Sequence, residues 1–495
     1  MFSCRSTKKP NHSRKFLFPK FRYLHSEKTS MVKKIISFAL VLYSFLAIAQ
    51  TAVSGGIFQN TTWTLAGSPY IVNGSIVVFP GKTLTIQPGV EIQINNQSSS
   101  NIYIEARGTI NCIGTNNLPI KVYPLFDTLN TVAWKGFVCT NSQGGVLNAD
   151  RFQISNAHFP LSYETLPTNQ QYTNCVFKRC FQAVTVGNAV ALSNCQFIDN
   201  EVGVYGWSYF AIDNCLFKDN TTSLFAYATA LTLTNSDFID NQVGLTFASN
   251  VFDSIYVADC QFLNNAVALN YPNKGTVKNC LFSDNTTAIQ YAYKCEIFNN
   301  SFIYNELALE ASVNADIHNN QINSNWGGLL ISGVSNVQES PLIYDNQICS
   351  NITYNVSNNT NMNYSLLSNC FCDIDSAQIE ALLIDGYDDI TKGLINYQVY
   401  DSSCTVLLRT VYKFGPGVGL DETGTELRFE NPVNREFVLF GEGEFATITV
   451  SDLSGKSFVF PASGSNRFDV SALPAGLYIL TAIDDQNVKR RFVKL

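Results

Sequence analysis

The sequence predicts an all-β protein in which short strands stack into a long coil, and three observations support this fold class. A phrase of Asn or Asp, Cys, any residue, Phe, any residue, Asp or Asn, and Asn returns eight times between Asn174 and Ile348. Most copies lie 20 or 21 residues apart, and such a fixed period indicates one supersecondary unit per repeat, stacked on the next. The segments between the apolar positions are too short for a helix.

Each repeat is predicted to hold three short strands. The Phe column, taken as position zero, comprises Phe177, Phe197, Phe217, Phe238, Phe262, Phe282, Phe302 and Ile322. Apolar residues also recur five residues before it and seven residues after it, for example Ile212 and Leu224 around Phe217. Because apolar and polar residues alternate with a period of two at all three places, each is expected to be a strand with one face in the core.

Two columns of asparagine are expected to turn the corners between strands. Asn or Asp stands three residues before each Phe, where a residue that tolerates a left-handed backbone can turn the chain. The second column stands three residues after the Phe and comprises Asn200, Asn220, Asn241, Asn265, Asn285, Asn305 and Asn325. At the interstrand spacing of about 4.8 Å, amides stacked in this way can bond to one another and to buried backbone groups.

These columns of Phe, Cys and Asn resemble the right-handed parallel β-helix of the pectate-lyase-like superfamily. The resemblance covers residues 57–400, and the segment Leu84–Ile92 looks like one of the first, capping turns of such helices. It implies coils of about 20 residues with three short strands each. The fold hosts lyases, hydrolases, adhesins and surface stalks, so the resemblance specifies the architecture and not the chemistry.

The start of the chain is typical of a secretory signal peptide. Residues 1–30 carry eight Lys or Arg and one acid and show no apolar periodicity, so we interpret them as a non-native extension; a genuine targeting arm is the alternative. Residues 31–49 hold a positive start, an apolar run and a small-x-small site, with cleavage expected near Gln50. The apolar run is too short to span a membrane, and no other transmembrane candidate is found.

The charge balance argues against nucleic acid as a partner. Without residues 1–50 the chain keeps 22 Lys or Arg and 38 Asp or Glu, a net charge near −16. Such an acidic chain is a poor binder of polyanions.

The cysteines fall into two groups. Cys175, Cys195, Cys215, Cys260 and Cys280 share one inward column with Ser236 and Asn300, and we interpret them as small buried apolar residues. Neighbours in that column could also reach disulfide distance, so oxidation is the open alternative. Cys349, Cys370, Cys372 and Cys404 lie outside the column and are the better disulfide candidates.

We divide the remainder of the chain into three parts. Residues 50–414 are the expected β-helix with its N-terminal cap and a closing segment, in which Ser376 is predicted to cap a short helix. The Gly- and Pro-rich residues 415–427 are a linker. Residues 428–495 resemble the C-terminal sorting domain of type IX secretion substrates in Bacteroidetes-like bacteria, through a Glu-Asn-Pro element, a Leu-Pro-Ala-Gly-Leu-Tyr element and a basic end. The residues that carry this signal are Asn431, Pro432, Gly476, Tyr478, Lys489 and Arg490. A generic small β-sandwich is the alternative.

The pectate-lyase-like resemblance brings no catalytic residue with it. In those enzymes the substrate lies over the outward face of one parallel sheet, which here follows the second Asn column. Lyases of this type need Ca²⁺-binding carboxylates beside an Arg or Lys base, and hydrolases need paired carboxylates. The expected face offers Glu310 as a carboxylate and no Arg or Lys.

Two other groups of residues are candidate sites. Asp199, Asp219 and Asp240 form a partial acidic column that could hold Ca²⁺, with a purely structural role at the turn as the alternative. Tyr205, Trp207, Phe225 and Tyr227 are expected to point outward, where flat aromatic rings suit the apolar faces of sugars; a covering loop is the alternative. His158 and His318 lack a nucleophile nearby in sequence and are interpreted as solvated or satisfied.

The function that follows is an exported cell-surface or extracellular module, non-catalytic and adhesive or glycan-binding. Its expected partners are the type IX secretion machinery and a polysaccharide or surface glycan, and it requires no cofactor. The alternative is a polysaccharide lyase or glycoside hydrolase whose reactive groups come from outside the regular face. Converging Asp, Glu, Arg and Lys would favour the enzyme, whereas aromatic rings and amides alone would favour the binder.

Overall fold

The computed structural model describes residues 50–401, residue 404 and much of residues 428–494. Not described are residues 1–49, 98, 130–131, 167–169, 188, 228–229, 249–254, 367, 373–374, 399, 402–403, 405–427, 430–434, 441–444, 453–455, 465, 475, 484–485 and 495. The expected extension, signal peptide and linker, together with Asn431 and Pro432 of the expected sorting signal, therefore lie outside the described residues.

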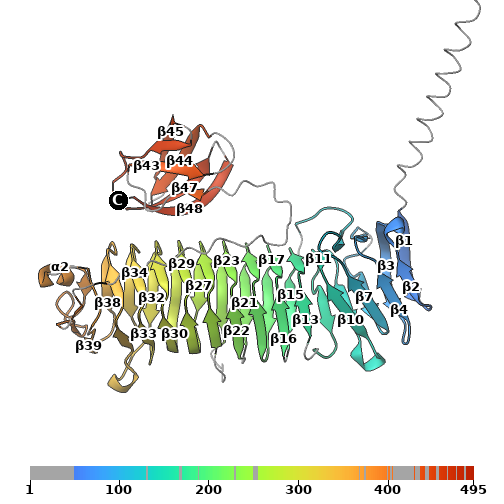
Figure 1. Cartoon of the computed structure of the whole chain (residues 1–495), viewed down its shortest axis with the longest axis horizontal. Coiled ribbons are helices and arrows are strands. Elements are labelled where there is room, and N and C mark those ends of the chain that lie inside the picture. The colour runs from blue at the N-terminus through green and yellow to red at the C-terminus, as the bar shows by residue number, and fades with distance from the viewer. Residues whose placement is uncertain are drawn as a thin grey trace, which may run out of the picture. The chain divides into compact units, whose positions relative to one another are not determined.

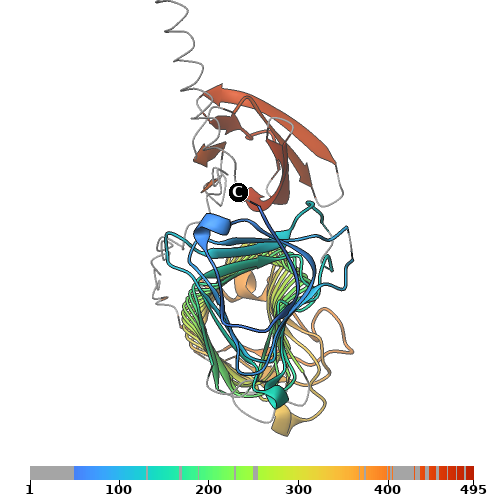
Figure 2. The same ribbon diagram turned by 90° about the vertical axis from the view of Figure 1, so that its right-hand side faces the viewer.

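Residues 50–401 form a right-handed parallel β-helix of about 13 turns (Figure 1). Viewed along its axis, the turns superpose into a closed outline with the core inside (Figure 2). Strand pairing is parallel throughout this part, from β1 pairing with β3 to β39 pairing with β41. Helical structure in the described chain is limited to α2 (Ser376–Glu380) and the 3-10 turns η1 (Leu65–Gly67), η2 (Asn141–Gln143) and η3 (Val337–Glu339). No described helix reaches the length and apolar character needed to cross a membrane.

Three stacks of strands build the regular turns, and we number them in chain order. Sheet 1 carries the Phe column and comprises β11 (Phe152–Ser155), β14 (Val176–Lys178), β17 (Gln196–Ile198), β20 (Leu216–Lys218), β23 (Asp237–Ile239), β26 (Gln261–Leu263), β29 (Leu281–Ser283), β31 (Ser301–Ile303), β34 (Gln321–Asn323) and β37 (Gln347–Cys349). Sheet 2 comprises β12 (Leu161–Tyr163), β15 (Gln182–Val186), β18 (Val202–Gly206), β21 (Thr222–Ala226), β24 (Val243–Phe247), β27 (Val267–Asn270), the first part of β30 (Thr287–Phe298), β32 (Leu307–Ala311), β35 (Gly327–Ile331), β38 (Tyr354–Asn358) and β40 (Leu383–Ile384). Sheet 3 comprises β13 (Gln171–Thr173), β16 (Val190–Ser193), β19 (Phe210–Asp213), β22 (Leu231–Thr234), β25 (Ile255–Ala258), β28 (Asn273–Lys278), the second part of β30, β33 (Asp316–His318) and β36 (Leu342–Tyr344).

The first turns are less regular. Six strands continue the large sheet toward the N-terminal end of the coil: β1 (Thr51–Ile57), β3 (Tyr70–Val78), β5 (Glu91–Ile94), β6 (Tyr103–Ala106), β8 (Ile120–Pro124) and β9 (Gly136–Cys139). Strands β2 (Thr61–Trp63), β4 (Thr83–Ile86), β7 (Thr109–Ile113) and β10 (Val146–Asp150) form a separate four-stranded sheet. Among the described strands, β10 pairs with β7 and β13 pairs with β16, so the stack is interrupted between β10 and β13.

The Phe column is the centre of the core. Its phenyl rings are fully buried, and those of Phe217 and Phe238 stack with centroids 4.5 Å apart and planes 5° apart. Burial of each such side chain stabilises the fold by about 1.5–3 kcal/mol. Each repeat of the sequence therefore adds one ring to this stack.

The corners of the coil follow the asparagine columns. The Asn three residues before each Phe adopts a left-handed backbone, as at Asn214 (φ 51°) and Asn279 (φ 57°). At the second corner the left-handed residue is the one before the second column, as at Asp219 (φ 58°). This lets Asn220 point inward, where its Nδ2 donates to Oδ1 of Asn241 at 3.0 Å and to the carbonyl of Phe197 at 2.9 Å. The same pattern continues through the column, so buried backbone groups are satisfied turn after turn.

The cysteine column consists of buried free thiols. Burial raises the pKa of the Cys175, Cys215 and Cys260 thiols in this column. It also raises the pKa of three buried thiols outside the column, Cys112, Cys180 and Cys295, to about 12. Neutral buried thiols are poor nucleophiles and pack as small apolar groups.

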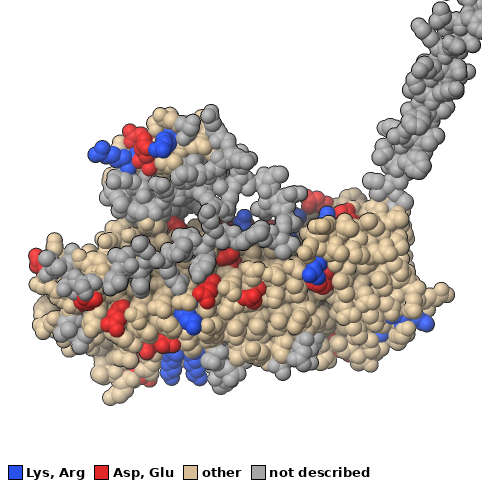
Figure 3. Space-filling model, viewed as in Figure 1, with Lys and Arg blue, Asp and Glu red and all other residues tan. Residues whose placement is uncertain are grey.

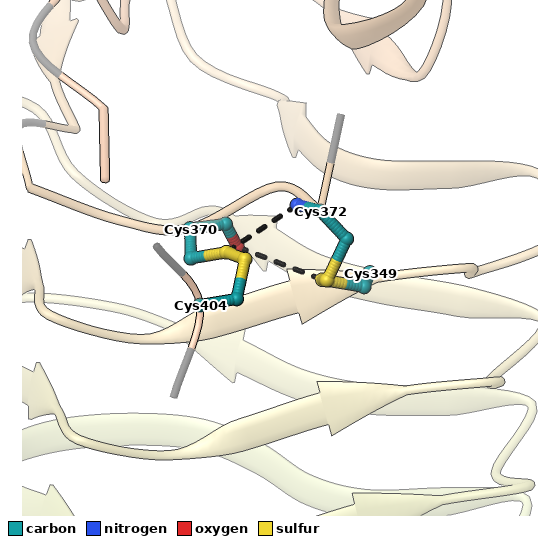
Figure 4. A group of neighbouring side chains, drawn as sticks. All are labelled: Cys349, Cys370, Cys372 and Cys404. Carbon is teal, nitrogen blue, oxygen red and sulfur yellow. Dashed lines mark hydrogen bonds between the residues drawn. A yellow bond between two sulfur atoms is a disulfide. The ribbon is translucent and has the colours of Figure 1, made fainter. Parts of the chain in front are cut away.

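The C-terminal end of the coil is closed by α2, β39 (Tyr364–Ser365), β41 (Ile395–Asn396) and two disulfides. The disulfides join Cys349 to Cys372 and Cys370 to Cys404, and Figure 4 shows them side by side. The cap of α2 differs from the expectation: Asp375 is the N-cap, because its carboxylate accepts from the Ala377 N–H at 2.9 Å and Ser376 is already helical. An aspartate competes well for this position because it complements the helix dipole.

Residues 428–494 form a small antiparallel β region of their own. Seven strands lie in the order β42 (Arg428–Phe429), β43 (Glu436–Phe440), β46 (Arg467–Asp469), β45 (Ser457–Gly464), β44 (Thr447–Asp452), β47 (Gly476–Ile483) and β48 (Gln486–Lys494). Their core includes Phe437, Ile448 and Phe468. Of the expected sorting residues, Gly476 begins β47, Tyr478 donates to the Pro474 carbonyl at 3.0 Å, and Lys489 and Arg490 lie in β48.

Candidate functional site

An aromatic cluster lies at the corner where the chain passes from sheet 2 to sheet 3. Trp207 directly follows β18, Tyr209 directly precedes β19, and Tyr227 follows β21 one turn further on. Tyr205 and Phe225 are register partners on the outward face of sheet 2. We call Trp207, Tyr209 and Tyr227, together with Tyr205 and Phe225, the aromatic corner.

The rings of the aromatic corner have different roles. Tyr205 and Phe225 stack with centroids 5.1 Å apart and planes 8° apart, so their faces cover one another. Trp207 is tilted instead, by 53° to Tyr205 and by 64° to Tyr227, at 5.3 and 4.9 Å. Its side chain is 47% exposed. About half of the Trp207 side chain is therefore open to solvent, while its ring contacts Tyr205 and Tyr227.

Aromatic residues return at the same corner several turns later. Tyr271 follows β27 and stacks on Tyr293 of β30 at 5.8 Å, and Tyr291 of β30 is 44% exposed. The Lys294 ammonium lies 4.9 Å from the Tyr293 ring centroid. Sequence reasoning did not identify these residues, although Tyr271 and Tyr291 lie 20 residues apart, which is the spacing of the repeat.

The outward row of sheet 2 continues away from the aromatic corner with uncharged polar groups. Thr246, Asn270 and Gln290 are successive register partners of Phe225, and the Asn270 amide donates to the Thr246 hydroxyl at 3.1 Å. Glu310 follows one turn later and is largely buried, with Ser332 donating to its carboxylate. Figure 3 shows a face on which acidic and basic side chains are scattered, some of them next to one another, over a mostly uncharged surface.

The predicted acidic column lies at the corner beside the second Asn column. Asp199, Asp219 and Asp240 all have left-handed backbones, with φ between 56° and 59°. Asp240 accepts from the Asn264 amide at 2.6 Å. Among the described residues, the convergent set of metal-ligating atoms is instead the four-cysteine cluster, whose sulfurs lie within 4.8 Å of one another and are paired as disulfides. Calcium binding at the acidic column stays a prediction.

A second row of polar and aromatic side chains lies on the outward face of sheet 3. Lys278, Phe298, His318 and Tyr344 are successive register partners. Tyr256, Glu296 and Asp316 flank them in the adjacent row. We call these seven residues the sheet 3 strip.

Electrostatic contacts connect the members of the sheet 3 strip. The Lys278 ammonium lies 5.0 Å from the Tyr256 ring centroid, and its hydrogen bond to Tyr256 raises the Lys278 pKa. His318 stacks between Phe298 at 5.2 Å and Tyr344 at 5.0 Å, and its Nε2 lies 3.5 Å from Glu296 Oε1. Desolvation, followed by the charge of Asp316, raises the Tyr344 pKa. A cation, an imidazole and two carboxylates thus meet on one face.

His158 lies apart from these groups. It packs on Phe159 and Phe181 with ring centroids at 4.1 and 4.8 Å. Burial, and then the charge of Lys135, lowers its pKa. His318, by contrast, belongs to a cluster that sequence reasoning did not find.

Comparison with known proteins yields little beyond this geometry. No family model matches the chain, and no curated protein matches it. Among solved structures, a double mutant of the periplasmic alginate epimerase AlgG is similar at 11% identity and a TM-score of 0.40, and another crystal structure of the periplasmic alginate epimerase AlgG at 12% identity and 0.31. Each match covers 67% of this chain and 77% of the other. The architecture described above rests on the strand register of the chain itself.

Proposed function

We propose that this protein is an exported, non-catalytic surface module that binds a polysaccharide along the aromatic corner. The tilted, half-exposed indole of Trp207 is the observation that carries the proposal. Aromatic rings held by stacked neighbours on a rigid sheet offer a flat apolar platform at little entropic cost. The C–H faces of a sugar ring fit such a platform.

The sugar at Trp207 is uncharged in this proposal. Gly206, Ser208 and Tyr209 around the indole carry no charge, and the adjoining row of sheet 2 offers hydroxyl and amide groups. Such groups bond sugar hydroxyls without a charge requirement. Lys274 and Lys294 occur several turns away, so an acidic polysaccharide is a distinct outcome of the test.

The test is binding of the full chain to immobilised neutral and acidic polysaccharides, with Trp207→Ala as the variant. Tyr387→Ala is the matched control, because Tyr387 is an aromatic residue that is 76% exposed and lies in the closing segment. Loss of binding in Trp207→Ala alone supports the proposal. Equal binding by both variants contradicts it.

Export through the outer membrane belongs to the same proposal. Residues 428–495 serve as a type IX sorting tail, and the protein ends at the cell surface or outside the cell. The support is a small antiparallel region with a core of its own, which ends in the basic strand β48. Such a region can be recognised by secretion machinery without altering the coil.

The sheet 3 strip favours a second candidate function, a polysaccharide lyase or glycoside hydrolase. Glu296 and Asp316 are neighbours on adjacent turns, beside Lys278 and His318. Carboxylate pairs perform glycoside hydrolysis, and a basic side chain beside carboxylates suits proton abstraction. Release of unsaturated or reducing sugar products by the wild type and not by Glu296→Gln would establish the enzyme. Absence of products from both neutral and acidic polysaccharides would leave binding as the function.

A further inference from the structure

Four cysteine sulfurs meet where the last turns of the coil are closed (Figure 4). Cys349 ends β37, Cys370 and Cys372 follow one turn later, and Cys404 comes from further along the chain. All four sulfurs lie within 4.8 Å of one another. They are paired as two disulfides, but the same four atoms are close enough for a second arrangement.

The spacing of the sulfurs suits a single metal ion. Zn²⁺ binds four thiolates at about 2.3 Å in a tetrahedron, which places the sulfurs about 3.8 Å apart. Sulfurs joined in a disulfide start about 2 Å apart, so they reach this spacing by rotation of the side chains once the disulfides are reduced. Soft thiolate ligands in a tetrahedral set favour zinc over magnesium, calcium and manganese.

Hydrogen-bond donors already point at two of the sulfurs. The Cys372 N–H donates to Cys370 Sγ at 3.4 Å, and the Gln347 side-chain amide donates to Cys372 Sγ at 3.5 Å. Donors of this kind stabilise negative charge on sulfur, and a cysteine must carry that charge to bind a metal. They also orient metal ligands in proteins.

Backbone bonds hold the segments that carry these cysteines, independently of the disulfides. The Ile348 N–H donates to the Cys370 carbonyl at 2.8 Å, and the Cys370 N–H donates to the Asn346 carbonyl at 2.7 Å. Further along the chain, the Asp401 N–H donates to the Asn369 carbonyl at 3.0 Å. The sulfurs therefore stay close together when the disulfides are broken, and such preorganisation lowers the cost of binding.

A reduced state of the four-cysteine cluster is accessible. Every cysteine is synthesised as a thiol, so four thiols are present before either disulfide forms. In the folded chain Cys372 is exposed and Cys404 is half-buried, so one cysteine of each disulfide is open to an external thiol. Access of this kind favours thiol–disulfide exchange.

We propose that the four-cysteine cluster binds one Zn²⁺ when its thiols are reduced, so that this end of the coil is held either by the metal or by the two disulfides. Binding replaces the proton of each thiol by a bond to zinc. Oxidation reverses it, and each disulfide that forms gives two electrons to a small-molecule disulfide. That molecule takes up two protons and leaves as two thiols, and the zinc ion is released.

Zinc binding by the reduced full chain tests the proposal. The chain is reduced with a phosphine, freed of the reductant without oxygen, and titrated with Zn²⁺ in competition with a zinc-sensitive dye. Cys372→Ala and Cys404→Ala each remove one ligand from the open side of the cluster. Cys260→Ser is the matched control, because it changes a free cysteine of the inward column, in which Ser236 already occurs.

Cobalt gives a second readout of the same site. Co²⁺ bound by four thiolates in a tetrahedron shows strong charge-transfer absorption in the near ultraviolet and intense visible bands. The reduced wild type should show both, and the two ligand variants should show a weaker charge-transfer band because they offer one thiolate fewer.

The expected result is about one Zn²⁺ per reduced chain of the wild type and of Cys260→Ser. Affinity should be weaker by about tenfold or more in each ligand variant. A small-molecule disulfide added to the zinc-bound chain should release the metal. Absence of zinc from the reduced wild type, or equal affinities of the wild type and both ligand variants, overturns the proposal. Retention of zinc after both disulfides have formed overturns it as well.

Discussion

The side-chain amide of Asn241 donates to Oδ1 of Asn265 at 2.9 Å, one turn further along the coil. The same amide donates to the Phe217 carbonyl at 3.0 Å, and Asn241 Oδ1 accepts from the backbone N–H and the side chain of Asn220. One buried side chain thus connects three successive turns. It satisfies backbone groups that water cannot reach.

Replacing this residue is predicted to destabilise the coil. Asn241→Leu leaves the Asn220 N–H and the Phe217 carbonyl without partners, so the free energy of unfolding should fall by about 1–3 kcal/mol or more. Gln242→Leu is the control, because Gln242 is an exposed amide next in the chain. Denaturant unfolding of both variants measures the difference. Equal stability of the two would contradict the role of the Asn column.

The thiol count is predicted to separate the two groups of cysteines. In a chain that starts at Gln50, nine cysteines are free and buried, whereas Cys349, Cys370, Cys372 and Cys404 are paired. Titration with a thiol reagent in denaturant should therefore give nine thiols per chain, and almost none without denaturant. A count of five or fewer in denaturant would show that the inward column is cross-linked.

Stability is predicted to depend on pH through Asp237. Burial on the face of sheet 1 raises its pKa from 3.8 to about 7, so the folded chain holds this proton more tightly than the unfolded chain. The contribution of Asp237 to the free energy of unfolding is therefore most favourable below about pH 4. This stabilisation is lost as the pH rises to about 7, and the loss amounts to up to ~4 kcal/mol.

Asp237→Gln removes this titration. Its register neighbour Gln261 already carries an amide at the same position. The variant should be more stable than the wild type at pH 8, with the gap closing toward pH 4, whereas the exposed Glu201→Gln should show no such change. If the difference in the free energy of unfolding between the wild type and Asp237→Gln stayed constant from pH 4 to pH 8, the raised pKa would be ruled out.

Removal of the C-terminal region is predicted to change the location of the protein and not its fold. Deleting residues 430–495 leaves the described core of the coil untouched, so the thermal unfolding of the coil should be unchanged. The truncated chain should accumulate in the periplasm, because the sorting tail is missing. Cell fractionation measures this, and normal surface exposure of the truncated form would refute the sorting proposal.

The repeat determined how much of the molecule could be predicted. The Phe and Asn columns, for example Phe217 and Asn220, repeat with a fixed spacing. The reason is that each turn must stack its ring and bond its amide to the same positions of the next turn. Strand order and register follow from that spacing. The N-cap of α2 was misplaced by one residue, since Asp375 and Ser376 are both good capping residues and local sequence does not rank them decisively.

The functional surfaces were harder to predict because they do not obey the repeat. The outward position of Lys278 is filled by Phe298, His318 and Tyr344 in the next turns, so its chemistry becomes visible only when register partners are aligned across four turns. Tyr271 and Tyr293 sit in corners of variable length. A pocket lined by Asn148 and Gln170 lies where the stack is interrupted between β10 and β13, and a pattern of regular turns cannot reveal such an interruption.

Binding at Trp207 is the most direct test of the central claim. Calorimetric or surface-based titration of the wild type, Trp207→Ala and Tyr387→Ala with the tightest-binding polysaccharide measures it. Loss of an exposed aromatic platform should weaken binding by ~10- to 100-fold in Trp207→Ala and leave Tyr387→Ala equal to the wild type. Equal affinities of all three proteins would contradict the account.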